Sequence, residues 1–585
     1  MTSTSATKGA AWLLEPGDAA SMLTPERLSD EHRLIGQTSR EFAEKEVIPG
    51  IERLEAKDWT FARHLLQRAG ELGLLGVDAP EEFGGVGLDK AAALVVSSHI
   101  AGSASFSAAF GAQNNLAISP ILYFGTPDQK ARYLPKLISG AMVGAYALSE
   151  SGSGSDALGA SARAVRLPDG GFALTGEKMW ITNGGFADVF IVFAKVDGEH
   201  FTAFIVERGF RGVSTGQEEH KMGLHGSSTT PLILQEAEVP AANLLGDIGK
   251  GHKVAFNVLN FGRYKLGAMC VGGCCEAIGE SARYAAARRQ FGKPIASFGA
   301  IRHKLAEMTV RTYALESLLY RTAGLIDASI AQNGGPNAVL GAMEEFAIEA
   351  SIAKVAGSET LNFVLDENVQ IHGGNGFVKD YPAERHFRDA RVNRIFEGTN
   401  EINRLLIPGM LIRRALKGEL PLIAAARSLQ DEILGSPVMA GARGEGPFDE
   451  QRAAVLGFKK VALMSLGLAM QRYGDELTDQ QEVLMWIADM MISVACAESA
   501  LLRASTSAGP LAPLHVDAAS IFISDAASLV EALARQTLAA MAEGDTLRTQ
   551  MAALRRLLKT APIDTVSRRR RIADETVRRG SYIFQ

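Results

Sequence analysis

Residues 188–207, DVFIVFAKVDGEHFTAFIVE, contain two runs of β-branched and aromatic side chains separated by Asp197 and Gly198. Such runs joined by Asp-Gly are typical of a β-hairpin, because the tight turn needs residues that tolerate a positive φ. A third run, FALTG at residues 172–176, follows another Asp-Gly turn. We therefore expect a small, mainly antiparallel β domain over about residues 164–244.

The chain on either side of this region reads as helical. Before it, SDEHRLIGQTSREFAEKEV (residues 29–47) starts with a Ser that suits an N-cap and places apolar residues roughly on one face. After it, EAIGESARYAAARR (residues 276–289) is rich in Ala and is followed by the Gly and Pro of FGKPI, which end helices. The sequence thus predicts a mainly α protein with a central β domain.

We expect the chain to be divided into six segments. They are an N-terminal arm (1–28), an N-terminal helical domain (29–142), the central β domain (143–252), a helical bundle (253–417), a Gly/Pro-rich linker (418–450) and an additional helical domain with a basic tail (451–585). The tail contains four consecutive arginines, Arg568–Arg571. A solvated helix face is the usual explanation for such a run, and contact with an anionic partner such as a membrane surface is the alternative.

The composition excludes several classes of function. The 585 residues are 47% hydrophobic and 22% charged, as in folded domains. Lys and Arg (60) are slightly outnumbered by Asp and Glu (66), which gives a formal charge of -6, so we expect no nucleic-acid binding. The sequence shows no signal peptide, transit peptide or uninterrupted membrane span, and we expect a soluble, cytoplasmic protein of bacterial type.

The four cysteines indicate neither a disulfide framework nor a metal centre. Cys270, Cys274 and Cys275 lie together in an apolar stretch without the spacing of a metal site, and Cys496 stands alone. We expect buried free thiols, no bound metal and a reducing compartment.

Three Gly-rich passages suggest nucleotide binding, but none has a fitting pattern. SESGSGSDALG (149–159) misses the GxGxxG spacing, QIHGGNGF (370–377) has no strand before it, and GDIGKGHK (246–253) lacks the P-loop Ser or Thr. Taken singly, each passage is more often a turn than a cofactor loop. A dinucleotide, if bound, is therefore not bound by a Rossmann unit.

The stretch RIFEGTNEI (394–402) places a carboxylate between a bulky apolar pair and a glycine. Apolar neighbours penalise the ionised form of Glu397, and Gly398 lets another group approach the backbone closely. This combination suits a general base, and a simple turn is the alternative.

Five motifs occur in order along the chain: YALSESGSGSD (146–156), KMWITNGG (178–185), RRQFGKPI (288–295), QIHGGNGF (370–377) and RIFEGTNEI (394–402). Together they resemble the acyl-CoA dehydrogenase family over roughly residues 29–415. The likeness is greatest to the very-long-chain branch, whose members carry an extra helical C-terminal domain. KMGLHGSS (221–228) and LNFGRYKLG (259–267) are similar to that branch too.

The resemblance implies a fold and a reaction. The fold would be an N-terminal helical domain, an antiparallel β-barrel or sandwich domain and a C-terminal four-helix bundle, followed here by the additional helical domain. The reaction would be the FAD-dependent α,β-dehydrogenation of a long or very-long-chain fatty acyl-CoA to the trans-2-enoyl-CoA in fatty acid β-oxidation, with electrons passed to electron-transfer flavoprotein. An acyl-CoA oxidase and a non-catalytic assembly factor on the same scaffold are the alternatives.

The same resemblance implies roles for residues at matching positions. Glu397 matches the catalytic base, and an apolar slot would raise its pKa from about 4.3 by roughly two units. Arg263, Ser155 and Gly398 match substrate contacts. The residues that match FAD contacts are Tyr146, Leu148, Ser149, Trp180, Ile181, Thr182, Arg288, Phe291, Gln370, Gly373, Gly374, Thr399 and Glu401.

Three of these matches carry further implications. Arg288 and the motifs around it match residues that reach the FAD of a neighbouring subunit, which implies a homodimer. Gly262 stands where some family members carry their base, so the sequence leaves Glu397 as the matching carboxylate. Glu401 is acidic where a neutral amide often stands, and its role is open.

Overall fold

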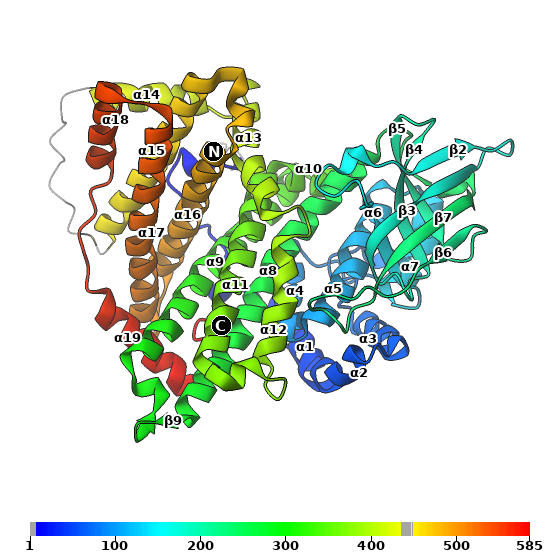
Figure 1. Ribbon diagram of the computed structural model, residues 1–585, viewed down its shortest axis with the longest axis horizontal. Helices are drawn as coiled ribbons and strands as arrows, with labels where there is room; N and C mark the ends of the chain where they lie inside the picture. Colours follow the sequence, from blue (N-terminus) through cyan, green and yellow to red (C-terminus); the bar gives the residue numbers. More distant parts are fainter. Residues whose placement is uncertain (1–7, 435–445, 447) are drawn as a thin grey trace.

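The N-terminal helices lie against one side of a β-sheet, and a long helical bundle joins this part of the protein to a second helical domain (Figure 1). The computed structural model describes residues 8–434, 446 and 448–585. The Ser29 hydroxyl caps the first helix by accepting a hydrogen bond from the backbone N–H of His32, as the sequence predicts. The N-terminal helices are α1 (Asp30–Phe42), α2 (Ile51–Glu55), α3 (Trp59–Glu71), α4 (Lys90–His99), α5 (Ala104–Gly111), α6 (Ile118–Phe124) and α7 (Pro127–Ile138).

The predicted hairpin is present, and its strands lie within an eight-stranded sheet of order β6-β7-β3-β2-β4-β5-β8, with β1 beside β4. The sheet is mainly antiparallel, but β1 and β2 each pair with β4 in parallel. Asp197 in the turn between β4 and β5 has a φ of 54°, as the turn chemistry requires. The strands are β1 (Gly144–Ala147), β2 (Arg163–Arg166), β3 (Phe172–Thr182), β4 (Val189–Val196), β5 (His200–Glu207), β6 (Val213–Thr215), β7 (Thr229–Val239) and β8 (Leu244–Leu245).

Strand β4 has both faces buried, which explains its continuous apolar sequence. Phe190 and Val192 belong to one hydrophobic cluster, whereas Ile191 and Phe193 belong to another on the opposite face of the sheet. A strand covered on both sides reads as a run of apolar residues and not as an alternation. The sheet is therefore held between two cores.

The bundle begins with two very long helices, and α8 packs closely along α11. Glycines make this approach possible, because a Cβ at Gly267 would lie 3.1 Å from the carbonyl oxygen of Ala353, and one at Gly357 would lie 3.1 Å from the Cα of Gly267. The elements are α8 (Gly251–Ala287), the β9–β10 hairpin (Arg289–Gln290 and Lys293–Pro294), α9 (Gly299–Asn333), α10 (Ala338–Glu345), α11 (Ala347–His372), α12 (Ala383–Ala390) and α13 (Asn400–Leu416).

The additional helical domain shares a hydrophobic core with the bundle. One continuous cluster of buried residues contains Tyr313 of α9 together with Val494 and Ile521 of the additional domain. Its helices are α14 (Leu422–Leu434), α15 (Asp449–Tyr473), α16 (Gln481–Thr506), α17 (Ala512–Met541), α18 (Gly544–Leu557) and α19 (Thr565–Arg579). The expected linker over 418–450 is thus wrong in its first half, which is helical. The Gly/Pro-rich residues 435–445 and 447 lie outside the described residues.

Two segments of the additional domain have the length and apolarity of membrane-spanning helices. The apolar windows of Asp449–Asp479 and Gln481–Thr506 are 67% and 78% buried inside the protein, respectively. Burial of this extent is typical of core helices, and the shared core with the bundle accounts for their composition.

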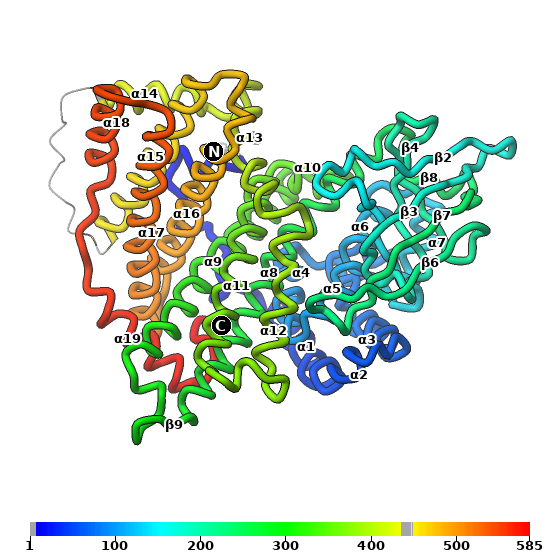
Figure 2. Tube along the Cα trace, in the orientation of Figure 1, coloured from blue at the N-terminus to red at the C-terminus, as the bar shows by residue number. Residues whose placement is uncertain are grey.

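The N-terminal arm ties the additional domain to the bundle (Figure 2). The indole of Trp12 donates a hydrogen bond to Glu349 of α11 at 3.0 Å. A few residues further on, the Lys459 ammonium of α15 donates to the carbonyl oxygen of Glu15 at 2.7 Å. Because the arm contacts both parts, it fixes how they pack together.

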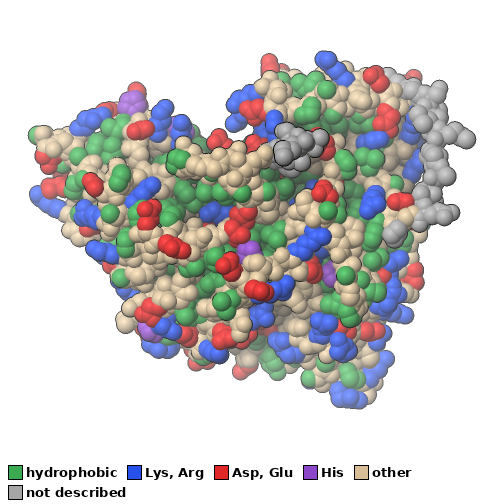
Figure 3. Space-filling model, turned by 180° about the vertical axis from the view of Figure 1, so that it is seen from behind, with side chains coloured by type: hydrophobic (Ala, Val, Ile, Leu, Met, Phe, Trp, Pro, Cys, Tyr) green, Lys and Arg blue, Asp and Glu red, His purple; other side chains and the backbone are tan. Residues whose placement is uncertain are grey.

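The basic tail is a solvated face only in part, because Arg570 and Arg571 are exposed and Arg569 is buried. Arg569 is only 8% exposed and forms ion pairs with Glu307 and Asp525, while Arg568 and Arg571 both pair with the buried Asp517. Three of the four arginines are therefore paired with acidic side chains, although Arg571, like Arg570, is exposed. Lys, Arg, Asp and Glu side chains are interspersed over the face shown in Figure 3.

Candidate functional site

The stretch RIFEGTNEI forms a strained loop between α12 and α13. Glu397 and Gly398 are consecutive residues with positive φ, 59° and 77°. Lys354 of α11 and Asn403 of α13 each donate a hydrogen bond to the carbonyl oxygen of Gly398 at 2.8 Å, and Arg263 of α8 donates to that of Glu397 at 3.2 Å. A left-handed conformation is unfavourable for glutamate, so these donors hold the loop in place.

The Glu397 carboxyl group lies against Gly262 of α8. A Cβ at Gly262 would lie 2.6 Å from Oε2 of Glu397 and 2.8 Å from Oε1. The two positions that the resemblance offers for a base therefore share one space, and glycine at 262 leaves that space to the carboxylate.

The environment of Glu397 makes it a base for neutral pH. Its Oε2 is shielded from solvent and has no hydrogen-bond partner among the described residues. Burial raises the pKa of this carboxyl group to about 7, although the charges of Arg263 and Lys354 oppose the rise. The sequence predicts a raised pKa from the apolar neighbours alone, and the structure agrees.

Tyr146 of β1 faces the same region from the sheet. Its hydroxyl is buried without a hydrogen-bond partner in the described part of the chain. Burial, and then the negative charge of Glu397, raises the pKa of this phenol. An orphaned buried hydroxyl beside the carboxyl group marks a place where a bound molecule completes the hydrogen bonding.

Trp180 lies at an irregularity in β3, between Lys178 and Ile181, where the pairing with β7 shifts register. Its side chain is 56% exposed and its φ is 59°, which is rare for a bulky residue. A core position, the usual place for a lone Trp, is thereby ruled out. Ile181 is buried and Thr182 is partly buried at the end of the same strand.

The Gly-rich loop after β1 is held from beneath by a buried ion pair. The Lys178 ammonium donates to Glu150 at 2.6 Å and to the carbonyl oxygen of Leu148 at 3.2 Å, and both charged side chains are almost fully buried. The carbonyl oxygen of Ser149 accepts from the backbone N–H of Met179 at 2.9 Å. These bonds fix Leu148 and Ser149 beside β3. Ser155, further along the loop, is exposed.

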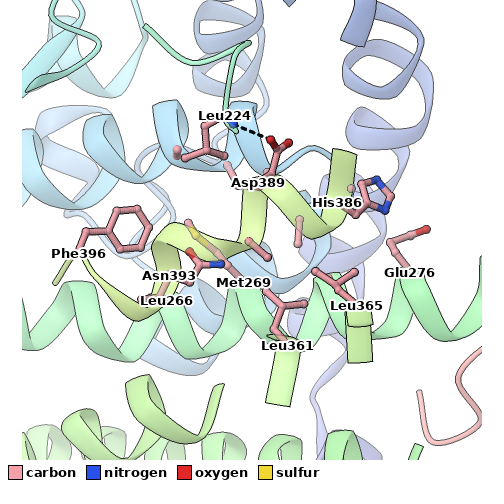
Figure 4. Close-up of a pocket in the computed structure, with 17 residues that line it drawn as sticks. Leu224, Leu266, Met269, Glu276, Leu361, Leu365, His386, Asp389, Asn393 and Phe396 are labelled. Carbon is pink, nitrogen blue, oxygen red and sulfur yellow. Dashed lines mark hydrogen bonds between the residues drawn. The ribbon is translucent and has the colours of Figure 1, made fainter. Parts of the chain in front are cut away.

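An apolar pocket begins beside the Glu397 loop and is lined by residues of α5, α8, α11 and α12 (Figure 4). Phe396 and Leu224 lie at one end, whereas His386 and Glu276 lie at the other. The remaining lining residues are Ala101, Gly102, Ala104, Ser107, Ala108, Leu266, Met269, Gly273, Leu361, Leu365, Asp389, Ala390 and Asn393. A hydrocarbon chain would be desolvated along this path.

The remaining predicted residues gather at the far end of the bundle. Arg288 ends α8, Phe291 is 93% exposed in the β9–β10 hairpin, and Gln370, Gly373 and Gly374 are exposed at the end of α11. At about 1.5 Å per residue, Arg288 lies about 40 Å along α8 from the position of the base. Within a single chain, the residues at this end of the bundle are therefore too far from Glu397 to share a site with it.

Two predicted residues have local roles in the loop. The Thr399 hydroxyl caps α13 by accepting from the backbone N–H of Ile402 at 3.2 Å. Glu401 is exposed in the first turn of that helix, where a negative charge is favourable. The sequence analysis missed Lys354, Asn403 and Lys178, because a polar residue within an apolar helix or strand is ordinarily taken as exposed.

The sequence matches family models along most of its length. The family model described as "Acyl-CoA dehydrogenase, N-terminal domain" matches residues 29–141. The model of the "Acyl-CoA dehydrogenase, middle domain" matches residues 145–237, and that of the "Acyl-CoA dehydrogenase, C-terminal domain" matches residues 249–411. A second family of the same description, "Acyl-CoA dehydrogenase, C-terminal domain", matches residues 457–556 in the additional domain.

Individual relatives agree with this assignment. A "Probable acyl-CoA dehydrogenase" of Bacillus subtilis is 47% identical over 577 residues, which are 97% of each chain. A crystal structure of an acyl-CoA dehydrogenase from Bacillus anthracis, complexed with FAD, is 46% identical with a TM-score of 0.96 and covers 99% of this chain and 100% of its own. A mitochondrial very long-chain specific acyl-CoA dehydrogenase of Bos taurus is 40% identical over 401 residues, 66% of this chain and 58% of that protein. The chain belongs to the acyl-CoA dehydrogenase family.

Proposed function

We propose that this protein is an FAD-dependent dehydrogenase that converts a long-chain acyl-CoA to the trans-2-enoyl-CoA. The observation that supports this most directly is Glu397, a buried carboxyl group with a pKa of about 7 next to Phe396, which lines an apolar pocket. Its pKa suits removal of a weakly acidic proton from the carbon next to a thioester. The sequence motifs and the family supply the substrate class.

The side chains of Tyr146 and Trp180 and the loop at Leu148 and Ser149 suit the binding of FAD. An exposed indole and a buried orphaned hydroxyl offer stacking and hydrogen bonding to a planar ring, and the braced loop at Leu148 and Ser149 offers backbone groups beside it. When bound there, FAD supplies the acceptor for the hydride that leaves the β-carbon.

The chain's own part in the reaction is proton transfer and charge stabilisation. Glu397 takes the α-proton: the C–H bond breaks, an O–H bond forms on the carboxyl group, and the electron pair moves toward the thioester oxygen. The backbone N–H of Glu397 has no hydrogen-bond partner among the described residues, so it is free to donate to that oxygen. Arg263, 8% exposed, adds a fixed positive charge next to it.

The length of the pocket supports a long acyl chain. Leu266 and Glu276 on α8 are ten residues apart, which is about 15 Å at about 1.5 Å per residue. An extended hydrocarbon advances roughly 1.3 Å per carbon for C–C bonds of about 1.5 Å, so roughly a dozen carbons fit. Glu276 is exposed, so the far end is open and a longer chain can extend past it.

We also propose a homodimer with a shared cofactor site. The Arg288 guanidinium has no hydrogen bond or ion pair with any described residue, and Phe291 and Phe377 are 93% and 85% exposed at the same end of the bundle. These features suit an interface in which one copy presents this end to the FAD diphosphate of the other.

Electron-transfer flavoprotein is the proposed electron acceptor, and β-oxidation the proposed pathway, both on the family resemblance. Dye-coupled turnover across an acyl-CoA length series tests the substrate class, with a maximum at about twelve carbons or more expected. A preference for short chains contradicts the length class. Rapid peroxide formation in air, without electron-transfer flavoprotein, favours an oxidase. Purified protein that binds no FAD favours the assembly factor.

Glu397→Gln tests the base. The variant should retain FAD and substrate binding while turnover falls by several orders of magnitude, because the amide cannot accept the α-proton. Turnover within tenfold of the parent enzyme, with the flavin spectrum unchanged, removes Glu397 from the mechanism.

A further inference from the structure

Lys354 is a buried lysine with no carboxylate partner of its own. It lies in the middle of α11 and is 0% exposed. Its ammonium donates to the carbonyl oxygen of Gly398 at 2.8 Å and to the side-chain oxygen of Asn400 at 2.7 Å, and no ion pair joins it to an acid within the described part of the chain. A buried charge is costly unless it is compensated. Here the compensation comes entirely from the loop that carries Glu397.

The contact with Asn400 connects this lysine to the start of α13. The side-chain nitrogen of Asn400 donates to the Ser358 hydroxyl at 3.0 Å and to Glu359 at 2.9 Å, so the amide is fixed on both sides. Lys354 thus holds the loop at two points, directly after Glu397 and three residues after it. Gly398, the second residue of the strained pair, is the first of these points, and Glu397 directly precedes it.

Lys354 differs from the other two side chains that donate hydrogen bonds to the backbone of this loop. Asn403 contacts the carbonyl oxygens of the loop but is neutral, and Arg263 contacts the carbonyl oxygen of Glu397 from α8. Lys354 is the charged donor that reaches the loop from α11. It therefore sets the loop against α11 while Arg263 sets it against α8, and the charges of both act on the carboxyl group of Glu397.

We propose that Lys354 is a positioning residue for the dehydrogenation, which holds the Glu397–Asn400 segment in its strained form and places a positive charge beside the base. This inference rests on the proposed role of Glu397. The charge favours ionised Glu397 before proton transfer. Burial lowers the pKa of Lys354 to about 8, so the ammonium is charged at neutral pH. The same charge then favours the enolate, because the negative charge moves to the thioester oxygen.

The groups that act on the titration of this site are few. Arg263 and Cys270 approach from α8, Glu397 comes from the loop, Glu401 comes from α13, and Tyr146 faces Glu397 from β1. Among them Lys354 and Arg263 are the cations, so removal of Lys354 leaves one positive charge where there were two. The deprotonation of Glu397 should then need a higher pH.

Lys354→Met in the full-length, FAD-loaded enzyme tests the inference. We expect kcat to fall about tenfold to a hundredfold with little change in KM, and the midpoint of the acidic limb of kcat/KM to rise by about one pH unit. Hydrogen exchange of the 394–402 peptide should accelerate in the same variant, with or without FAD. Unchanged kcat, midpoint and exchange overturn the proposal.

Companion variants separate positioning from simple stabilisation. Lys354→Arg keeps the charge and should return the midpoint toward that of the parent enzyme, even if kcat stays low; it also serves where the Met variant does not fold. Lys459→Met removes another buried lysine, which is 4% exposed in α15 and pairs with Glu498. This control should lower stability without moving the midpoint. A Lys459 variant that moves it as far as the Lys354 variant assigns the effect to general destabilisation and overturns the proposal.

The outcome for Glu397→Gln distinguishes the two levels of the account. If that variant is inactive while Lys354→Met behaves like the parent enzyme, the base stands and only the inference about Lys354 fails. If Glu397→Gln turns over normally, the proposed function fails first, whatever the Lys354 variants do.

Discussion

Substituting Gly262 by alanine tests whether the Glu397 carboxyl group works in the position where it is found. The new Cβ would lie 2.6 to 2.8 Å from three atoms of that group, whereas ordinary contacts begin at 3.4 Å. The carboxylate must therefore move by roughly 1 Å, and a misplacement of that size costs about a hundredfold in rate, or about 2.7 kcal/mol. We expect kcat to fall by about this factor.

Stability should change in the opposite direction to activity. Gly262 lies inside α8, and alanine is more favourable than glycine in a helix by about 1 kcal/mol. The new Cβ collides only with the end of the Glu397 side chain, which can rotate away, so the steric cost to stability is small. The variant should therefore unfold at the same temperature as the parent enzyme or at a slightly higher one. A fall in both kcat and stability would mean that the whole loop is displaced.

Gly409→Ala is the matched control. Gly409 also lies within a helix, α13, and a Cβ there would meet nothing within 4 Å. Its kcat should be that of the parent enzyme, with stability increased by up to about 1 kcal/mol. If Gly262→Ala also keeps kcat within threefold of the parent, the carboxyl group does not act from its place against α8, and the steric reasoning is refuted.

Three other perturbations test separate parts of the structure. Arg288→Ala should lower the FAD content of the purified protein and weaken dimerisation in ultracentrifugation, and flavin content equal to that of the parent would contradict the shared site. Trp180→Ala should weaken FAD retention without lowering the unfolding temperature of the apoprotein, since the side chain is 56% exposed; a large loss of apoprotein stability would make it a core residue. Arg503→Met removes the cation that pairs with Glu26 and the buried Glu316, so we expect a loss of about 3–5 kcal/mol in urea unfolding, partly recovered in Arg503→Met/Glu316→Gln, and a loss below about 1 kcal/mol would refute it.

Local patterns predicted much of the fold. The β-branched and aromatic run of β4 and the Asp197-Gly198 turn identified a strand and its hairpin without any knowledge of the rest of the chain. Helix α14 was missed, because the expected linker was drawn from residue 418 although the Gly/Pro-rich residues that mark a linker begin only at Gly435.

Long-range pairing accounts for the other differences. Arg569 pairs with Glu307, which is 262 residues away, and no spacing rule connects them. Lys354 was missed for the same reason: its partners, Gly398 and Asn400, lie on a loop more than forty residues further along. Glu397 itself was predicted, because its apolar neighbours and its glycine are adjacent in the chain.

The pH dependence of kcat/KM for a long-chain acyl-CoA tests the central claim most directly. Ionised Glu397 is the form that takes the α-proton, and burial raises its pKa to about 7, so activity should be low at pH 5 and rise with pH through an acidic limb centred near 7. Two acyl-CoA substrates whose α-protons differ in acidity should give the same midpoint. A profile that is already flat from pH 5 upward would show that the carboxyl group is not desolvated, and would contradict the account.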